Sequence, residues 1–100
     1  MVRSAGRGMI GRVLQGVKLR SDDLVWQKVD ADIVVLDLRT SIYFRINGSG
    51  AVLWEQLATE ATNTDLENSL VARYGISAEK ATSDVIAFLA DARDRGFLEE

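Results

Sequence analysis

The chain has 100 residues, of which 47% are hydrophobic, and a formal net charge of −3. A chain of this length forms one domain with a small core. It contains neither histidine nor cysteine, which excludes imidazole acid–base catalysis, thiol nucleophiles, disulfides and the usual zinc sites. Only carboxylates and three lysines remain for an enzyme, Lys18, Lys28 and Lys80. We therefore expect a binding protein without catalytic residues, cofactor or metal.

Charge is distributed unevenly along the chain. Residues 1–20 carry +5 without any acidic residue, and the remaining residues carry −8. Four glycines lie among these basic residues, which favours a flexible basic tail over residues 1–16, ahead of a domain over residues 17–100. An arm that touches nucleic acid or a membrane surface is the alternative. The basic residues are Arg3, Arg7, Arg12, Lys18 and Arg20.

No apolar run approaches the ~20 residues of a membrane span, and the N-terminus lacks the long apolar core of a signal peptide. Proline is absent, so no linker or second domain is indicated. These features predict a cytoplasmic protein.

Three short strands are predicted, over Leu24 to Val29, Ile33 to Leu36 and Ile42 to Ile46. Turns at Asp30-Ala31-Asp32 and at Leu38 to Ser41 separate them, which predicts an antiparallel sheet. The consecutive apolar residues of the second strand indicate a central position with both faces partly covered. Val17 to Arg20 is either a further short strand or the lead-in to the domain.

The apolar period changes to that of helices after Asn47. Asn47 or Ser49 is expected to cap a first helix that ends near residues 58–60. Thr64 and Glu67 have the spacing of a capping box for a second helix, and Gly75 is its expected end.

Ser77 is expected to cap a last helix that runs to about Arg95. Only Gly75-Ile76 separates it from the preceding helix, a connection typical of a helix-turn-helix. The predicted fold class is α+β: a winged helix-turn-helix with a three-stranded antiparallel sheet followed by three helices.

A helix-turn-helix suggests DNA binding, but the charge of the last helix argues against it. This helix contains four acidic and three basic residues, so its net charge is negative. Contacts with phosphates dominate DNA affinity, and a negative helix repels the phosphates. Two of the bases, moreover, lie at the C-terminal end, away from the part of the helix that reads bases. The acids are Glu79, Asp84, Asp91 and Asp94, and the bases are Lys80, Arg93 and Arg95.

The last helix has an apolar arc of roughly 160°, wider than the ~100° that a core-facing helix needs. Part of this arc is therefore expected to face a groove, although a small domain could bury all of it. The arc comprises Ala81, Val85, Ile86, Phe88, Leu89 and Ala92.

The third strand is expected to form the other wall of that groove. Strand alternation directs Ile42, Phe44 and Ile46 to the core and Tyr43 and Arg45 outward. Because this strand is the last in the sheet, one edge lacks a partner, and an extended peptide can add to such an edge.

The pattern from Leu24 to Leu98 resembles the PqqD-like peptide-binding domains of peptide-modifying systems. Each piece of the pattern is weak alone, whereas the ordered set is fairly specific. The residues that carry the resemblance are Leu36-Asp37, Tyr43-Phe44-x-Ile46-Asn47-x-x-Gly50-Ala51-x-x-Trp54, Asp84-Val85-x-x-Phe88-Leu89 and Gly96-Phe97-Leu98.

The resemblance implies a non-catalytic domain that binds the leader segment of a ribosomally made precursor peptide, between the third strand and the third helix. Asp84 would then either contact the leader or hold the start of the helix. The peptide-binding residues that the resemblance implies are Ile42, Tyr43, Phe44, Arg45, Ile46, Asp84, Val85, Phe88, Asp91 and Ala92.

The Asp23-Leu24-Val25-Trp26 opening most resembles the freestanding members of lasso-peptide pathways. That resemblance implies a separate leader peptidase and a macrolactam-forming cyclase as partners. A peptide carrier of the pyrroloquinoline quinone pathway is one alternative, and a winged-helix DNA-binding regulator is another. A carboxylate enzyme has no residue-level support, because the pair Asp30 and Asp32 is better explained as a polar turn.

Overall fold

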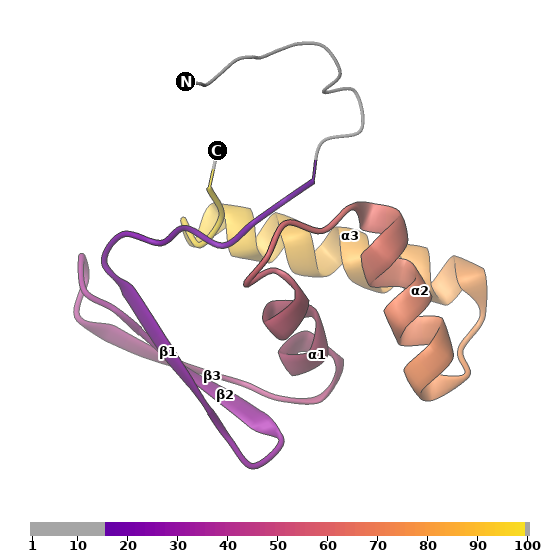
Figure 1. Cartoon of the computed structure of the whole chain (residues 1–100), viewed down its shortest axis with the longest axis horizontal. Helices are drawn as coiled ribbons and strands as arrows, with labels where there is room; N and C mark the ends of the chain where they lie inside the picture. Colours follow the sequence, from indigo (N-terminus) through magenta and orange to yellow (C-terminus); the bar gives the residue numbers. More distant parts are fainter. Residues whose placement is uncertain (1–15, 100) are drawn as a thin grey trace, which may run out of the picture.

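The computed structural model describes residues 16–99, in which three strands precede three helices (Figure 1). This order confirms the predicted α+β class and the winged helix-turn-helix arrangement. The elements are β1 (Leu24–Val29), β2 (Asp32–Asp37), β3 (Ile42–Ile46), α1 (Gly48–Gln56), α2 (Asn63–Tyr74) and α3 (Ala78–Asp94). Of the expected tail over residues 1–16, only Gly16 belongs to the described residues.

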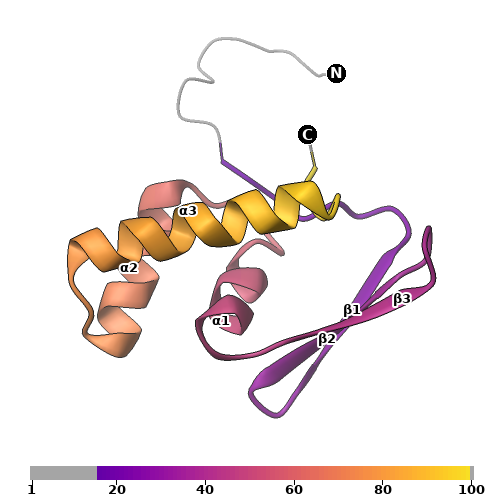
Figure 2. The same cartoon turned by 180° about the vertical axis from the view of Figure 1, so that it is seen from behind.

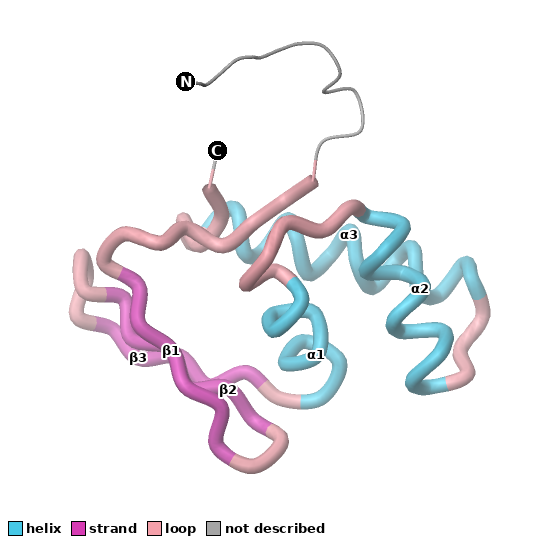
Figure 3. Tube along the Cα trace, viewed as in Figure 1, coloured by secondary structure: helices cyan, strands magenta, loops and turns pink. Residues whose placement is uncertain are grey.

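The sheet is antiparallel throughout, in the order β1-β2-β3. β2 is thus the central strand, as its apolar run predicts. Val35 pairs with Trp26 on one side and with Phe44 on the other. Figure 3 shows the helices on one side of the sheet, and the side chains of Ile33 and Val35 on that inner face are fully buried.

Three turn residues adopt left-handed backbone conformations, and the first of them is Asp23, with a φ of 57° just before β1. Asp30 has a φ of 58° in the turn between β1 and β2, and Ser41 has a φ of 61° just before β3. A positive φ favours glycine, because a Cβ atom is crowded there. The turn before β3 is closed by the Ser41 amide, which donates to the Asp37 carbonyl at 2.7 Å.

Trp54 of α1 is the centre of the core and is fully buried. Its ring meets Trp26 of β1 and Phe97 of the C-terminal segment edge to face, with centroid distances of 6.2 and 5.2 Å. These contacts fasten α1 to the sheet and to the end of the chain. Aromatic pairs of this geometry contribute about 0.5–1.5 kcal/mol beyond the area that they bury.

The helix ends follow local sequence, with two differences from the prediction. α1 ends at Gln56, ahead of the expected residues 58–60. α2 begins earlier than Thr64 because Thr62 is its N-cap: the Thr62 hydroxyl accepts from the Asp65 amide, and the Asp65 carboxylate accepts from the Thr62 amide. Gly75 ends α2 at a φ of 66°, and Ser77 caps α3, as predicted. Asn47 is the N-cap of α1.

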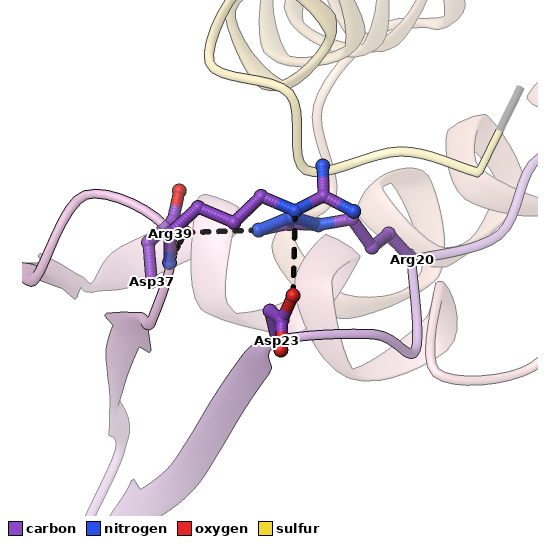
Figure 4. Close-up of polar contacts among 4 residues, drawn as sticks. All are labelled: Arg20, Asp23, Asp37 and Arg39. Atoms are coloured by element: carbon purple, nitrogen blue, oxygen red, sulfur yellow. Dashed lines mark hydrogen bonds and ion pairs between the residues drawn. The ribbon is translucent and has the colours of Figure 1, made fainter.

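The segment 17–20 is a lead-in fastened by isolated bridges. Val17 pairs with Ala61 before α2, and Leu19 pairs with Leu98 after α3. Arg20 then reaches the end of β2, where its guanidinium lies 3.1 Å from the Asp37 carboxylate (Figure 4). Arg39 and Asp23 form an exposed ion pair beside it, at 3.6 Å.

Candidate functional site

A cavity of about 280 Å³ lies between β3 and the C-terminal half of α3. Figure 2 shows these two elements on the same side of the molecule. Most of the lining is aromatic or small and apolar, with charged residues at the rim. The residues around the cavity are Phe44, Arg45, Ile46, Asn47, Gly50, Trp54, Phe88, Asp91, Ala92, Arg95 and Phe97.

The outer edge of β3 borders this cavity and pairs with no other strand of residues 16–99. The direction of the backbone groups along β3 can be deduced from the other side of the sheet. There the Leu38 amide donates to the Asp23 carbonyl, so the backbone groups of Leu38 point toward β1. Because these groups alternate in direction along a strand, the N–H and C=O of Val35 point the other way, toward β3, where they pair with those of Phe44. By the same alternation, Tyr43 directs its N–H and C=O to the free edge.

The floor of the cavity is made of packed aromatic rings and one glycine. Phe44 and Phe97 meet edge to face at 5.0 Å. A Cβ atom on Gly50 would lie 3.0 Å from Cγ2 of Ile46 and 3.5 Å from Cε1 of Phe88. The absence of a side chain at Gly50 therefore keeps part of the space between α1 and α3 open.

Both arginines at the rim are paired with carboxylates, Arg95 with Asp91 of the rim and Arg45 with Asp32 of β2. Arg95 donates to Asp91 at 3.0 Å, and its guanidinium lies 5.0 Å from the centroid of the Phe44 ring. Arg45 donates to the Asp32 carboxylate through Nε and through a terminal nitrogen, at 2.9 and 2.7 Å. The site thus presents apolar surface between compensated charges and suits an extended, largely apolar segment.

Six of the ten residues expected to bind peptide line the cavity: Phe44, Arg45, Ile46, Phe88, Asp91 and Ala92. Tyr43 lies at the edge of the sheet with 69% of its surface exposed. Ile42 is 50% exposed, which corrects its expected place in the core, because this end of β3 extends beyond the packed core cluster.

The other two expected residues lie elsewhere. Val85 is fully buried in the core, so its side chain has no surface to offer a ligand. Asp84 lies outside the cavity lining and pairs with Lys80 at 3.4 Å, as expected of a residue that stabilises the first turns of α3. Ile86, assigned to the apolar arc of that helix, is 56% exposed and also lies outside the cavity.

Five lining residues were not predicted: Asn47, Gly50, Trp54, Arg95 and Phe97. All but Arg95 belong to the motif that carries the family resemblance, and motif membership was the only sequence signal for them. Helical periodicity assigns Trp54 to the core, which is correct, and gives no indication that it also borders a cavity.

Lys80 of α3 and Arg95, its C-cap residue, are each paired with an acid of that helix. Lys80 pairs with Asp84, and Arg95 pairs with Asp91. Phosphate contacts would have to break these pairs, which argues against a DNA-reading role for this helix. Within residues 16–99, no group of three or more acidic residues is arranged to hold a metal ion, and no helix is long and apolar enough to cross a membrane.

Comparisons with known proteins agree with this geometry. The sequence profile of the family described as "Coenzyme PQQ synthesis protein D (PqqD)" matches residues 32–98. The fold is similar to that of TbiB1, solved in complex with the TbiA(β) leader peptide, with a TM-score of 0.75 and 26% identity over 82% of this chain and 94% of that one.

A second solved structure, a lasso peptide synthetase B1 complexed with the leader peptide, has the same TM-score of 0.75 at 21% identity, over 85% of this chain and 99% of that one. No curated protein matches the sequence significantly.

Proposed function

Because the chain belongs to the PqqD family, we propose that it is a non-catalytic recognition protein for the leader segment of a ribosomally made precursor peptide. The proposed pathway is that of a lasso peptide, since the two similar structures hold leader peptides and one of them is a lasso peptide synthetase B1. The leader, once bound, would be presented to a separate leader peptidase and to a macrolactam-forming cyclase. Such a precursor is met in the cytoplasm, where ribosomes make it.

The observation that carries the proposal is the free edge of β3 beside an apolar cavity. The leader adds to the edge as a fourth strand, with hydrogen bonds to the backbone groups of Tyr43 and Arg45. Alternate leader side chains then point to the inner face of the sheet, where Phe44 and Phe88 line the cavity. Backbone pairing supplies affinity, and the cavity supplies selectivity.

Of the residues implied by the resemblance, Phe44, Ile46, Phe88 and Ala92 would contact these inward leader side chains. Arg45 and Asp91 would border the bound peptide at the rim. Asp84 would act on helix stability rather than on the leader, since it pairs with Lys80 outside the cavity.

Isothermal titration calorimetry tests the proposal with two synthetic peptides from the precursor encoded beside this gene, the leader and the core peptide. The leader should bind the full chain with a Kd between about 10 nM and about 10 μM, because strand addition offsets the entropy of ordering a short peptide. The core peptide should not bind. Equal binding of the two peptides would refute leader recognition.

A further inference from the structure

A second groove borders α1, on a different face of that helix from the cavity beside β3. Its first part, of about 240 Å³, lies between the β1–β2 turn, the start of α1 and the end of α2. Its second part, of about 260 Å³, continues between α1 and α2, which lie side by side in Figure 1. Val52 of α1 and Arg73 of α2 line both parts. The two parts therefore form one groove, which we call the α1–α2 groove.

The α1–α2 groove combines apolar surface with an ion pair. Tyr74 of α2, which is 46% exposed, and the half-buried Val52 provide an aromatic ring and aliphatic surface. On the side of β1, the Lys28 ammonium lies 3.3 Å from the Glu55 carboxylate, so these two charges compensate each other. An exposed ring beside aliphatic surface suits an apolar side chain of a peptide.

Arg73 is the charged group of the groove that has no partner. Four other arginines of the described residues pair with carboxylates, whereas Arg73 has no hydrogen bond or ion pair within residues 16–99. The remaining residues that line the second part of the groove are uncharged. This part is therefore positive, and a guanidinium binds a carboxylate through charge-assisted hydrogen bonds.

This charge selects among the possible occupants. Residues 1–15 of the chain carry three arginines and no acidic residue, so they do not complement Arg73. Nucleic acid does not fit either, because Asp30 and Glu55 border the first part of the same groove. A peptide segment with an acidic and an apolar side chain complements the groove.

The groove begins where the cavity beside β3 ends. Asn47 borders that cavity, and the next residue, Gly48, borders the groove. Gly48 has a φ of 59°, and a Cβ atom on it would meet no atom within 4 Å. The space beside Gly48 is therefore open, and a peptide chain can pass from one site to the other around the start of α1.

The direction of the leader strand decides which leader residues reach the groove. Antiparallel strand pairs are about two- to threefold commoner than parallel ones. Because β3 runs from Ile42 to Ile46, an antiparallel leader strand starts beside Ile46 and ends beside Ile42. The leader residues that precede the paired strand are then the ones next to Gly48.

We propose that the α1–α2 groove is a second binding site for the leader. It takes the residues that precede the paired strand, with an acidic side chain on Arg73 and an apolar side chain against Tyr74 and Val52. The inference rests on the proposed leader binding at β3. Because both segments belong to one peptide, the second contact forms at a high effective concentration, and it should raise leader affinity about tenfold.

The test uses a series of synthetic leaders shortened stepwise from the N-terminus, with calorimetry on the full chain. The shortest peptide that still binds should do so about tenfold more weakly than the full leader. Amide ¹H–¹⁵N spectra locate the lost contact. The signals of Gly48, Arg73 and Tyr74 should shift on addition of the full leader and stay in place on addition of the shortest one.

Two matched variants separate the groove from a general effect of charge. Arg73→Gln should weaken the full leader about threefold to fivefold, as expected for one exposed ion pair, and leave the shortest leader within about twofold of the parent. Arg93→Gln makes the same change of charge at an exposed residue of α3 outside both sites, and it should affect neither peptide. Arg73→Lys keeps the charge and should recover part of the loss.

Equal affinity of the full and the shortest leader, or a loss in Arg73→Gln that both peptides share, would overturn the second site while leader recognition at β3 still stood. A parent chain that binds neither peptide would instead overturn the proposed function. Leader affinity that rises on deletion of residues 1–15, and rises equally in Arg73→Gln, would assign the groove to the N-terminal segment and overturn the proposal.

Discussion

Arg20 and Asp37 form a buried ion pair, with 3.1 Å between a guanidinium nitrogen and a carboxylate oxygen and less than a tenth of either side chain exposed. Arg20 lies ahead of β1, and Asp37 ends β2. The pair therefore closes the sheet at the end where the Arg39 amide also donates to the same Asp37 oxygen, at 2.9 Å.

Arg20→Ala should lower the free energy of unfolding by about 3 kcal/mol, because it leaves a buried carboxylate without its counter-ion. Arg39→Ala is the matched control: its side chain is exposed and its ion pair with Asp23 is long, so the loss should be under about 1 kcal/mol. Urea unfolding followed by circular dichroism measures both. Similar losses in the two variants would contradict the role assigned to the buried pair.

The two threonines before and within α2 should differ in a similar measurement. Thr62→Ala removes the N-cap and should cost about 1 kcal/mol. Thr64→Ala, inside the first turn, should cost a few tenths of a kcal/mol. A larger loss of stability for Thr64→Ala than for Thr62→Ala would contradict Thr62 as the N-cap and favour the capping box of Thr64 and Glu67 that the sequence predicts.

Proline substitutions in β3 should separate stability from leader binding. The Tyr43 amide points to the free edge, so Tyr43→Pro should remain folded and lose leader affinity tenfold or more. The Phe44 amide points to β2, so Phe44→Pro should break the internal ladder and lower the melting temperature. Calorimetry and thermal melting are run on both. A folded Tyr43→Pro variant that binds leader as the parent does would show that the peptide does not pair with β3.

Gly50→Ala adds one methyl group to the cavity. The new Cβ lies 3.0 Å from Ile46, whose partly exposed side chain can shift by a few tenths of an ångström, and alanine stabilises a helix by up to about 1 kcal/mol relative to glycine. We expect an unchanged or higher melting temperature together with a threefold to tenfold weaker leader affinity, on the order of 1 kcal/mol. Weaker binding with a lower melting temperature would indicate a general disturbance of α1.

Leader affinity should depend little on salt. Arg45 and Arg95 are already paired with Asp32 and Asp91, so few counter-ions are released on binding. Between about 50 and 500 mM salt, the Kd should change less than about threefold. Duplex DNA should not bind once residues 1–16 are deleted. Tight binding of DNA by that truncated chain would favour a regulator over a peptide-binding protein.

The sequence predicted the strands well because alternation and turn residues are local signals. β1 and β3 have the predicted bounds, and β2 is one residue longer at each end. The start of α2 was predicted two residues late because Thr62 and Thr64 both offer a capping spacing. Ala61 is held in a long-range bridge with Val17, which the local sequence does not predict. Thr62 is the next residue along the chain, and it is therefore the first that can serve as the N-cap.

The site was predicted only in part because its composition depends on packing between distant segments. Phe97 reaches the cavity through its contacts with Phe44 and Trp54, which no local pattern encodes. Val85 and Phe88 lie on one helical face, but only the side chain of Val85 is fully buried in the core. The Arg20–Asp37 pair spans 17 positions and likewise has no signature in the sequence.

The bridges at the beginning of the domain also determine how it can be joined to other proteins. The Glu99 amide donates to the Lys18 carbonyl at 2.8 Å, so the chain enters and leaves the fold at the same point, as Figure 1 shows. Domains with adjacent ends tolerate insertion into a loop of a host protein. This fold is therefore suited to serve as an inserted module of a larger enzyme, with its sheet edge still open to a peptide.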